Sequence, residues 1–217
     1  MRRPQPKKTK LELTLLTLSP AQLGVRVSNR TDSTLYFAIH RQLHQGRIKA
    51  ARADFTRLIR NHPASTLVPH AFVAFGEHFL RRRELNKALT LFSRAARYPR
   101  SSALRYAMYL EGYAYRTLKR PRRALGLAVK VIASSRRRAI PGDARLLRAA
   151  RALVVVSYVE VGKAARASAF FARVGGKDAF TMMMQLANAY YKLGRGMEAI
   201  TVRAAATRSL RKKRSIP

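Results

Sequence analysis

Residues 68–99 read VPHAFVAFGEHFLRRRELNKALTLFSRAARYP, a pattern that predicts two helices joined by a short turn. Gly76 has no Cβ and Ala88 has a small side chain, so two helices can approach closely where these residues face each other. Phe79 and Phe92 are spaced to fill the room beside that crossing. The stretch therefore predicts a helix pair that buries its aromatic side chains.

The same pattern recurs along the chain. In each occurrence an apolar helix is followed by a turn and by a second helix that starts near an alanine. These alanines are Ala51, Ala88, Ala124, Ala167 and Ala199, separated by 37, 36, 43 and 32 residues. Each helix pair leaves an apolar face that only a neighbouring pair can cover, so the units are expected to stack.

Glycines and prolines punctuate these units. Gly46, Gly162 and Gly194 stand where a first helix is expected to end, a position that often takes the left-handed conformation. Pro63 and Pro99 follow second helices, which proline cannot continue. The punctuation thus agrees with a tandem array of helix pairs.

The period, the small residues at helix crossings and the aromatic residues beside them resemble the tetratricopeptide repeat (TPR) family, whose period is about 34 residues. The resemblance covers residues 32–207 and implies an all-α fold, a right-handed α-solenoid of about five antiparallel helix pairs. It leaves residues 1–31 as a basic N-terminal arm or linker and residues 208–217 as a basic C-terminal tail. It also implies a non-catalytic scaffold that binds a protein or peptide.

Some stretches are also similar to TPR proteins of the myxobacterial cell envelope. They are residues 68–77, the run from Tyr106 to Tyr113, and the region from Phe170 to Met183. Many such relatives are exported, but this chain is short and carries arginine where acidic residues are expected. The likeness therefore does not fix its location.

The charge balance is strongly basic. Lys and Arg number 45 against 10 Asp and Glu, for a formal net charge of +35. Such a chain attracts polyanions, so an acidic protein partner is expected, with RNA or DNA as the alternative. Base composition of the genome is a second source of the arginine excess, because G- and C-rich codons raise Arg and Ala together.

No pattern points to catalysis. The chain has no cysteine, which excludes disulfides, thiolate nucleophiles and Cys-ligated zinc. It has no HExxH, GxSxG or GxxxxGK[ST] motif. His40 and His44 are spaced to share one helix face and a metal ion, but carboxylates are scarce around them. We predict no enzyme activity, no cofactor and no metal site.

The resemblance places the ligand groove on the first helix of each pair. The partner-binding residues expected there are Tyr36, Tyr106, Tyr109, Tyr113, Arg116 and Tyr191. Other positions expected to face the groove include His40, His44, His70, Glu77 and Arg81. Tyrosine suits a binding surface because it joins a rigid apolar ring to a polar hydroxyl. The alternative is that the same tyrosines pack against the next repeat.

Arginine clusters fall at or near turns, which align along one edge of a repeat array. They are Arg81, Arg82 and Arg83, then Arg120, Arg122 and Arg123, then Arg136, Arg137 and Arg138. We expect a basic ridge there that contacts a polyanion without reading its sequence. The alternative function, RNA binding, would combine this ridge with base stacking on tyrosine.

The N-terminal region is basic up to Lys10 and is followed by a leucine-rich run from Leu11 to Leu18. This is a faint likeness to a signal peptide, but Glu12 interrupts the apolar run and no clear cleavage site follows. A cytoplasmic location is therefore favoured over export. One strand-like stretch is expected within this arm.

Overall fold

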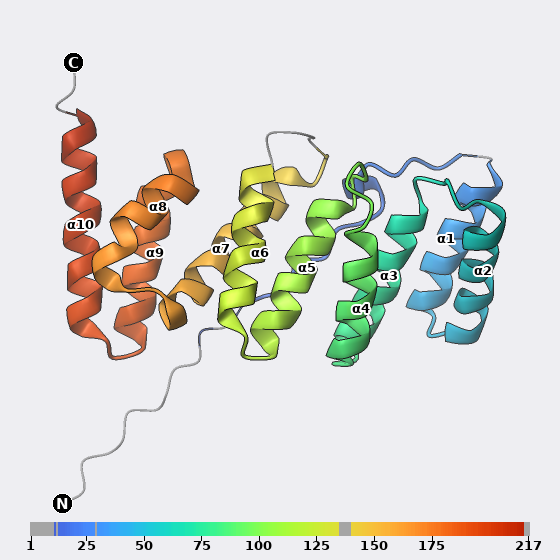
Figure 1. Cartoon of the computed structure of the whole chain (residues 1–217), viewed down its shortest axis with the longest axis horizontal. Helices are drawn as coiled ribbons and strands as arrows, with labels where there is room; N and C mark the ends of the chain where they lie inside the picture. Colours follow the sequence, from blue (N-terminus) through green and yellow to red (C-terminus); the bar gives the residue numbers. More distant parts are fainter. Residues whose placement is uncertain (1–10, 12, 29, 135–139, 215–217) are drawn as a thin grey trace, which may run out of the picture. The chain divides into compact units, whose positions relative to one another are not determined.

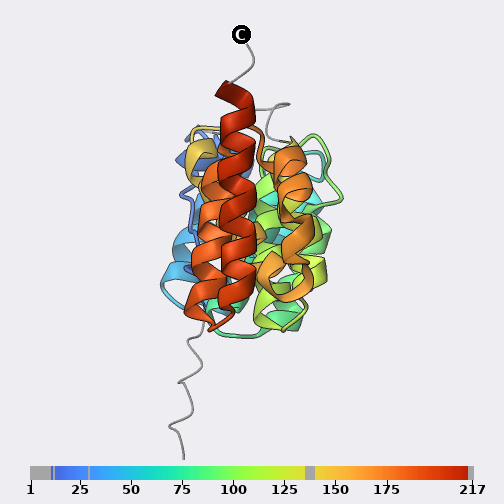
Figure 2. The same ribbon diagram turned by 90° about the vertical axis from the view of Figure 1, so that its left-hand side faces the viewer.

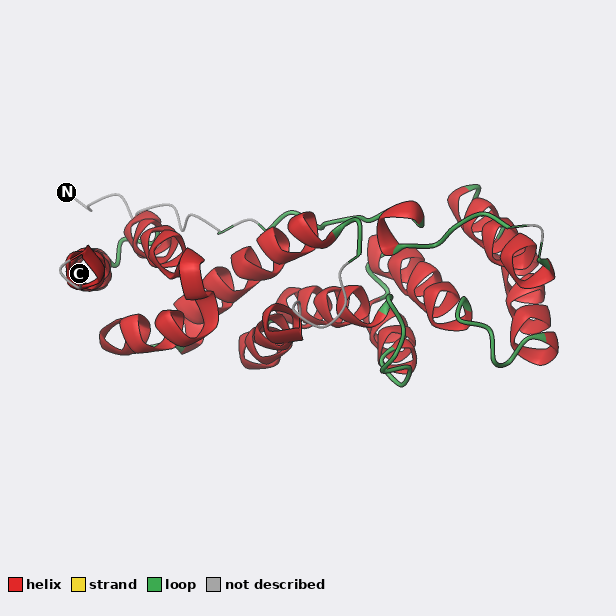
Figure 3. Cartoon of the chain, turned by 90° about the horizontal axis from the view of Figure 1, so that it is seen from above, coloured by secondary structure: helices red, strands yellow, loops and turns green. Residues whose placement is uncertain are grey.

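The computed structural model describes residues 11, 13–28, 30–134 and 140–214, which form two compact units (Figure 1). One unit comprises residues 16–150, and the other comprises residues 151–214 with the described residues before Leu16. The division falls inside one helix, α7 (Asp143–Val161). Throughout the described residues all regular structure is helical, as Figure 3 shows.

The unit of residues 16–150 is a stack of antiparallel helix pairs (Figure 1). Its pairs are α1 (Thr31–His44) with α2 (Ile48–Asn61), α3 (Val68–Arg81) with α4 (Leu85–Ala95), and α5 (Leu104–Thr117) with α6 (Pro121–Ser134). Successive pairs are packed together because α1 contacts α3 and α4 contacts α5. The first part of α7 completes the unit.

Close helix crossings form as the sequence predicts. A Cβ added to Gly76 in α3 would lie 2.3 Å from the ring of Phe92 in α4, so only glycine allows this approach. Ala51, Ala88 and Ala124 are fully buried at the corresponding places. The small residues of the repeat therefore set how closely the helices of a pair pack.

The turns within pairs share one backbone geometry. Gly46 and Gly194 have φ values of 74° and 73°, as predicted, while Arg83 and Lys119 occupy the same position with φ values of 60° and 56°. The prediction for Gly162 was wrong, because its φ is not in the left-handed region. Glycine is needed there for a different reason, since a Cβ would lie 2.2 Å from the ring of Tyr158.

The second unit contains the rest of α7, η2 (Ala164–Arg166), α8 (Ala167–Gly175), η3 (Gly176–Asp178), α9 (Ala179–Lys192) and α10 (Gly196–Arg214). Figure 2 shows α10 beside α9, which also packs on α8. Tyr158 of α7 contacts Phe170 and Phe171 of α8, with ring centroids 4.7 and 5.1 Å apart. The segment predicted as a tail from residue 208 is helical as far as Arg214.

Residues 16–25 of the predicted arm pack into the unit of residues 16–150. The segment is extended before a turn of 3-10 helix, η1 (Ala21–Leu23), and it buries Leu18, Leu23 and Val25. The amide of Gly142 donates a hydrogen bond of 2.9 Å to the carbonyl of Gln22. Among the described residues, no helix has both the length and the apolar composition that a membrane span requires.

Candidate functional site

Four polar side chains meet on the first helices of the pairs in residues 16–150. Glu77 of α3 accepts a hydrogen bond of 2.5 Å from the Tyr106 hydroxyl of α5. The ring of Tyr109 stacks on that of Tyr106, with centroids 6.4 Å apart and planes at 11°. Burial raises the pKa of Tyr36 of α1, and the charge of nearby Glu77 acts in the same direction. The sequence-based alignment thus grouped residues that the structure brings together, and we call them the groove residues.

The chain's own N-terminal segment covers these groove residues. The Leu16 amide donates to the Tyr109 hydroxyl at 3.1 Å, and the Leu18 amide donates to the Tyr106 hydroxyl at 3.0 Å. The Tyr106 hydroxyl also lies 3.2 Å from the Leu16 carbonyl, so its single proton can serve either that oxygen or Glu77. The two tyrosines therefore bind the main chain of an extended segment.

Side-chain burial adds to these main-chain contacts. Leu18 is only 2% exposed and packs on Gly142, where an added Cβ would lie 3.1 Å from both methyl groups of the leucine. A cavity of about 300 Å³ remains beside Leu18. Its lining includes His40, His44, Glu77 and Arg81. The segment thus fills part of the groove and leaves room next to its main apolar anchor.

Burial controls the ionisation of the groove. It raises the pKa of Glu77 to about 7, although the Tyr106 hydrogen bond and the Arg81 charge act in the opposite direction. Burial also raises the pKa of Tyr109 to about 12 and that of Tyr106 well above its ordinary value. The tyrosines are therefore neutral at physiological pH, and each hydroxyl can donate and accept hydrogen bonds, as binding to amides and carbonyls requires.

The six residues predicted to bind a partner differ in how exposed they are. Tyr36, Tyr106 and Tyr109 are buried, whereas Tyr113 and Arg116 on α5 are half-buried. Tyr191 belongs to α9 in the other unit and is 76% exposed. A partner can thus reach the hydroxyls of Tyr106 and Tyr109 only if residues 16–18 leave them.

Two histidines lie at the edge of the cavity beside Leu18. The rings of His40 and His44 are 4.7 Å apart, as their helical spacing predicts. Within the described residues, no set of three metal-ligating side chains gathers there or elsewhere. Burial lowers the pKa of His40, and the neighbouring His44 and Arg81 charges act in the same direction.

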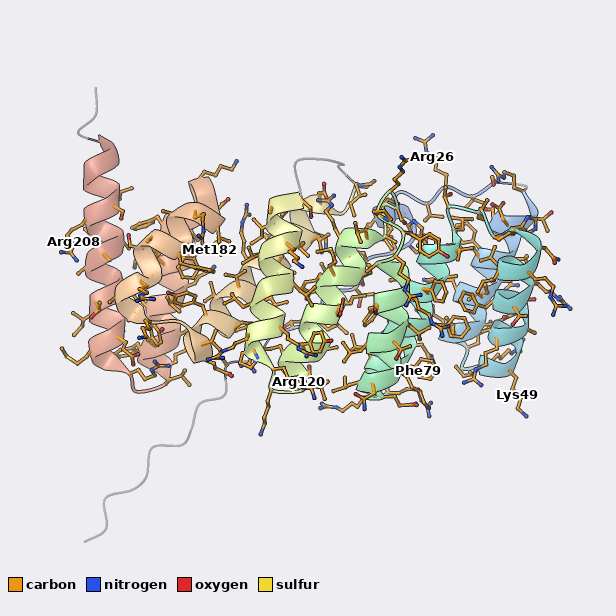
Figure 4. All side chains as sticks on the ribbon, in the orientation of Figure 1. Arg26, Lys49, Phe79, Arg120, Met182 and Arg208 are labelled. Carbon is orange, nitrogen blue, oxygen red and sulfur yellow. The ribbon has the colours of Figure 1, made fainter. Side chains whose placement is uncertain are left out.

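The arginines expected to form a ridge are exposed where the structure describes them. Arg82 and Arg83 lie in the turn after α3, Arg120 lies in the turn after α5, and both turns fall at the same end of their unit (Figures 1 and 4). Arg122 and Arg123 follow in the first turn of α6. Arg81 ends α3 with its side chain 3.9 Å from Glu77. Arg136, Arg137 and Arg138 lie outside the described residues.

The sequence reading did not identify residues 16–18 as part of the site. A signal existed, because leucine occupies every second position from Leu11 to Leu15 and again at Leu16 and Leu18, a spacing typical of an extended segment with one buried side. We interpreted this pattern as a strand-like stretch of an arm. Its position against the groove is a tertiary feature.

Comparison with known proteins bears on the fold. No protein-family model and no curated protein matches the chain. The chain is similar in structure to a kinesin light chain protein of Podosopora anserina with nearly identical TPR-like repeats. The TM-score is 0.54 and the sequence identity is 13%, and the match covers 88% of this chain and 100% of that one. The MamA protein is similar with a TM-score of 0.51 and 14% identity, covering 87% of this chain and 97% of the other.

At such identities the similarity shows the fold alone, and that fold is the TPR-like helical repeat. The predicted all-α fold of stacked helix pairs is confirmed. The likeness to cell-envelope proteins stays a prediction from the sequence.

Proposed function

We propose that this chain is a non-catalytic scaffold that binds a protein partner, and that its groove residues hold an extended peptide segment of that partner. One observation carries the proposal: the hydroxyls of Tyr106 and Tyr109 bind the main chain at Leu16 and Leu18. Any extended peptide offers the same amides and carbonyls, so this geometry suits a peptide ligand. The pocket for Leu18 would select a partner with an apolar side chain at that place.

The partner has to compete with the chain's own segment. An attached segment has an effective concentration in the millimolar range when its connection is short. A partner peptide therefore binds the groove only if it is present at high concentration or has additional contacts outside the groove. The formal net charge of +35 favours acidic residues for those additional contacts.

The nucleic-acid alternative has no specific observation in its favour. It required tyrosine rings for base stacking, and Tyr36, Tyr106 and Tyr109 are at most 1% exposed. Exposed arginines attract acidic proteins and nucleic acids alike. We therefore retain the protein-binding function.

The test uses the full-length chain and a fluorescent peptide of residues 13–25, LTLLTLSPAQLGV, followed by fluorescence anisotropy. In a double variant, Leu18→Asp with Leu23→Asp, two carboxylates would be buried by docking, so the attached segment should leave the groove. We expect this variant to bind the peptide at least ~10-fold more tightly than the wild type. A scrambled peptide is the control.

Adding Tyr106→Phe and Tyr109→Phe to that variant should weaken binding again, because the main-chain hydrogen bonds are lost. Peptide binding that ignores these tyrosines, or no binding to the double variant, would contradict the proposal. The acidic preference is tested with peptides extended by four glutamates or by four lysines. The glutamate form should bind more tightly, and high salt should remove the difference.

A further inference from the structure

A second cleft lies at the opposite end of the same unit from the arginine-bearing turns. Its volume is about 790 Å³, and it is formed by the stretches around Arg26, Pro63 and Pro99. The last two are the loops that link successive helix pairs. Figure 4 labels Arg26 at this end and Arg120 at the other. The cleft is therefore separate from the predicted ridge, whereas its lining residue His70 has its ring 6.1 Å from that of the groove residue Tyr36.

Positive charge dominates the lining of this cleft. Arg26, Arg30, Arg97 and Arg100 all line it, whereas Asp32 is the one carboxylate among its described lining residues. The side chains of Arg26 and Arg97 are exposed and form no ion pair within the described part of the chain. Two guanidinium groups are thus available to an incoming anion.

The single carboxylate cannot repel such an anion strongly. Asp32 accepts hydrogen bonds from the Ser65 hydroxyl at 2.8 Å and from the Ser33 amide at 2.9 Å. Arg30 lies 3.2 Å from the same carboxylate. These contacts, with the Ser65 bond foremost, hold the pKa of Asp32 below its ordinary value. The carboxylate oxygens are therefore already satisfied, and the Arg30 charge offsets that of Asp32.

A buried nitrogen in the cleft lining lacks a partner. His70 is 4% exposed, and its Nε2 lies 3.0 Å from the Ser102 hydroxyl. Its Nδ1 is buried and makes no hydrogen bond. Burial lowers the pKa of His70 to about 4, so the ring is neutral and has one proton to place. Either group can donate in the pair of His70 and Ser102, so Nδ1 is an unused donor in one tautomer and an unused acceptor in the other, and it is closed off from solvent.

We propose that this cleft binds a phosphate ester, with Arg26 and Arg97 on the phosphate oxygens. The cleft offers mainly donors, and a phosphate offers several acceptors to guanidinium groups in a matching geometry. Val25, Leu67 and Tyr98 also line the cleft and supply an apolar surface for the organic part of the ester. A phosphorylated peptide side chain and a small organic phosphate share this chemistry.

The test is isothermal titration of the full-length chain at constant ionic strength with a phosphoserine peptide, phenyl phosphate and inorganic phosphate. The variant Arg26→Gln with Arg97→Gln removes the two available guanidinium groups. The matched control, Arg82→Gln with Arg120→Gln, removes the same charge from exposed arginines at the other end. We expect the Kd of an ester to rise at least ~10-fold in the cleft variant and less than about twofold in the control.

The affinities of the two ester probes identify the natural ligand. If the cleft serves phosphorylated peptides, the phosphoserine peptide should bind more tightly than phenyl phosphate. If it serves small organic phosphates, the peptide should have no such advantage. Equal losses in the two variants would show a general effect of charge and overturn the proposal, as would no binding of either ester. The ring NMR signals of His70, assigned with His70→Gln, give an independent readout. They should shift on saturation with ester because His70 lines the cleft, and unchanged signals would place the ester elsewhere and overturn the proposal.

Discussion

Replacing Leu18 with alanine tests whether residues 16–18 occupy the groove in solution. Leu18 is 2% exposed and packs against Gly142, so the substitution removes buried contacts that hold the segment. Leucine-to-alanine changes in cores cost about 2–5 kcal/mol. The cavity of about 300 Å³ beside Leu18 shows that this site is not tightly enclosed, which places the cost near the lower end. We expect about 2–3 kcal/mol.

The assay is amide hydrogen exchange at Leu16 and Leu18, whose N–H groups donate to Tyr109 and Tyr106. A loss of about 2–3 kcal/mol in docking corresponds to exchange roughly 30- to 150-fold faster at these two amides. Val27→Ala is the matched control, because Val27 is 81% exposed and its truncation removes no buried contact. It should leave both rates unchanged.

Two results would refute this reasoning. If the Leu16 and Leu18 amides already exchange at unprotected rates in the wild type, the segment does not occupy the groove. If they are protected but Leu18→Ala leaves their rates unchanged, the leucine is not the anchor. The proposal that a partner displaces the segment would then lose its energetic basis.

Three further changes test the packing and electrostatics. Burial raises the pKa of Glu77 from 4.5 to about 7, so between these pH values the folded chain keeps a proton that the unfolded chain releases, and stability is lost as the pH rises. In urea unfolding, the stability of Glu77→Gln relative to wild type should therefore increase by roughly 2–3 kcal/mol from pH 5 to pH 8. A difference that stays constant with pH would contradict the pKa shift. Gly76→Ala should lower the free energy of unfolding by about 1–3 kcal/mol, because its Cβ would lie 2.3 Å from Phe92. The control Gly126→Ala has open space around it in α6 and should raise the free energy of unfolding by up to about 1 kcal/mol. If Gly76→Ala also stabilised the protein, the helices would not be closely packed at this crossing. Arg83→Gly should raise the melting temperature, because glycine adopts the φ of 60° without the strain of about 1 kcal/mol that a side chain brings. A lower melting temperature would mean that the contacts of the Arg83 side chain outweigh that strain.

The turns show where local sequence was sufficient and where it was not. Gly46 and Gly194 were predicted in the left-handed conformation and adopt it. Arg83 and Lys119 adopt the same conformation although they are not glycine. The reason is a helix-terminal hydrogen bond made by the residue that follows each of them. After Lys119, for example, the amide of Arg120 donates to the carbonyl of Tyr115 at 2.8 Å. Helix-terminal hydrogen bonds can impose a conformation that residue type alone does not favour.

The helix pairs and the way they pack could be predicted from the amino-acid sequence. Gly76, Ala88 and the aromatic residues near them act through size and periodicity, which are local properties that a single chain displays. The groove residues followed from the same register, since Tyr106 and Tyr109 share one face of α5 with helical spacing.

The segment that fills the groove could not be predicted from the sequence and is seen only in the folded chain. The bonds from Leu16 to Tyr109 and from Leu18 to Tyr106 join residues 93 and 88 positions apart. They use main-chain amides, which every residue except proline carries, so no residue type marks the partner of such a bond. The phosphate-ester cleft likewise depends on three separate stretches meeting at one end of the unit. Its arginines could not be distinguished by sequence from the many others in a chain of such strong positive charge.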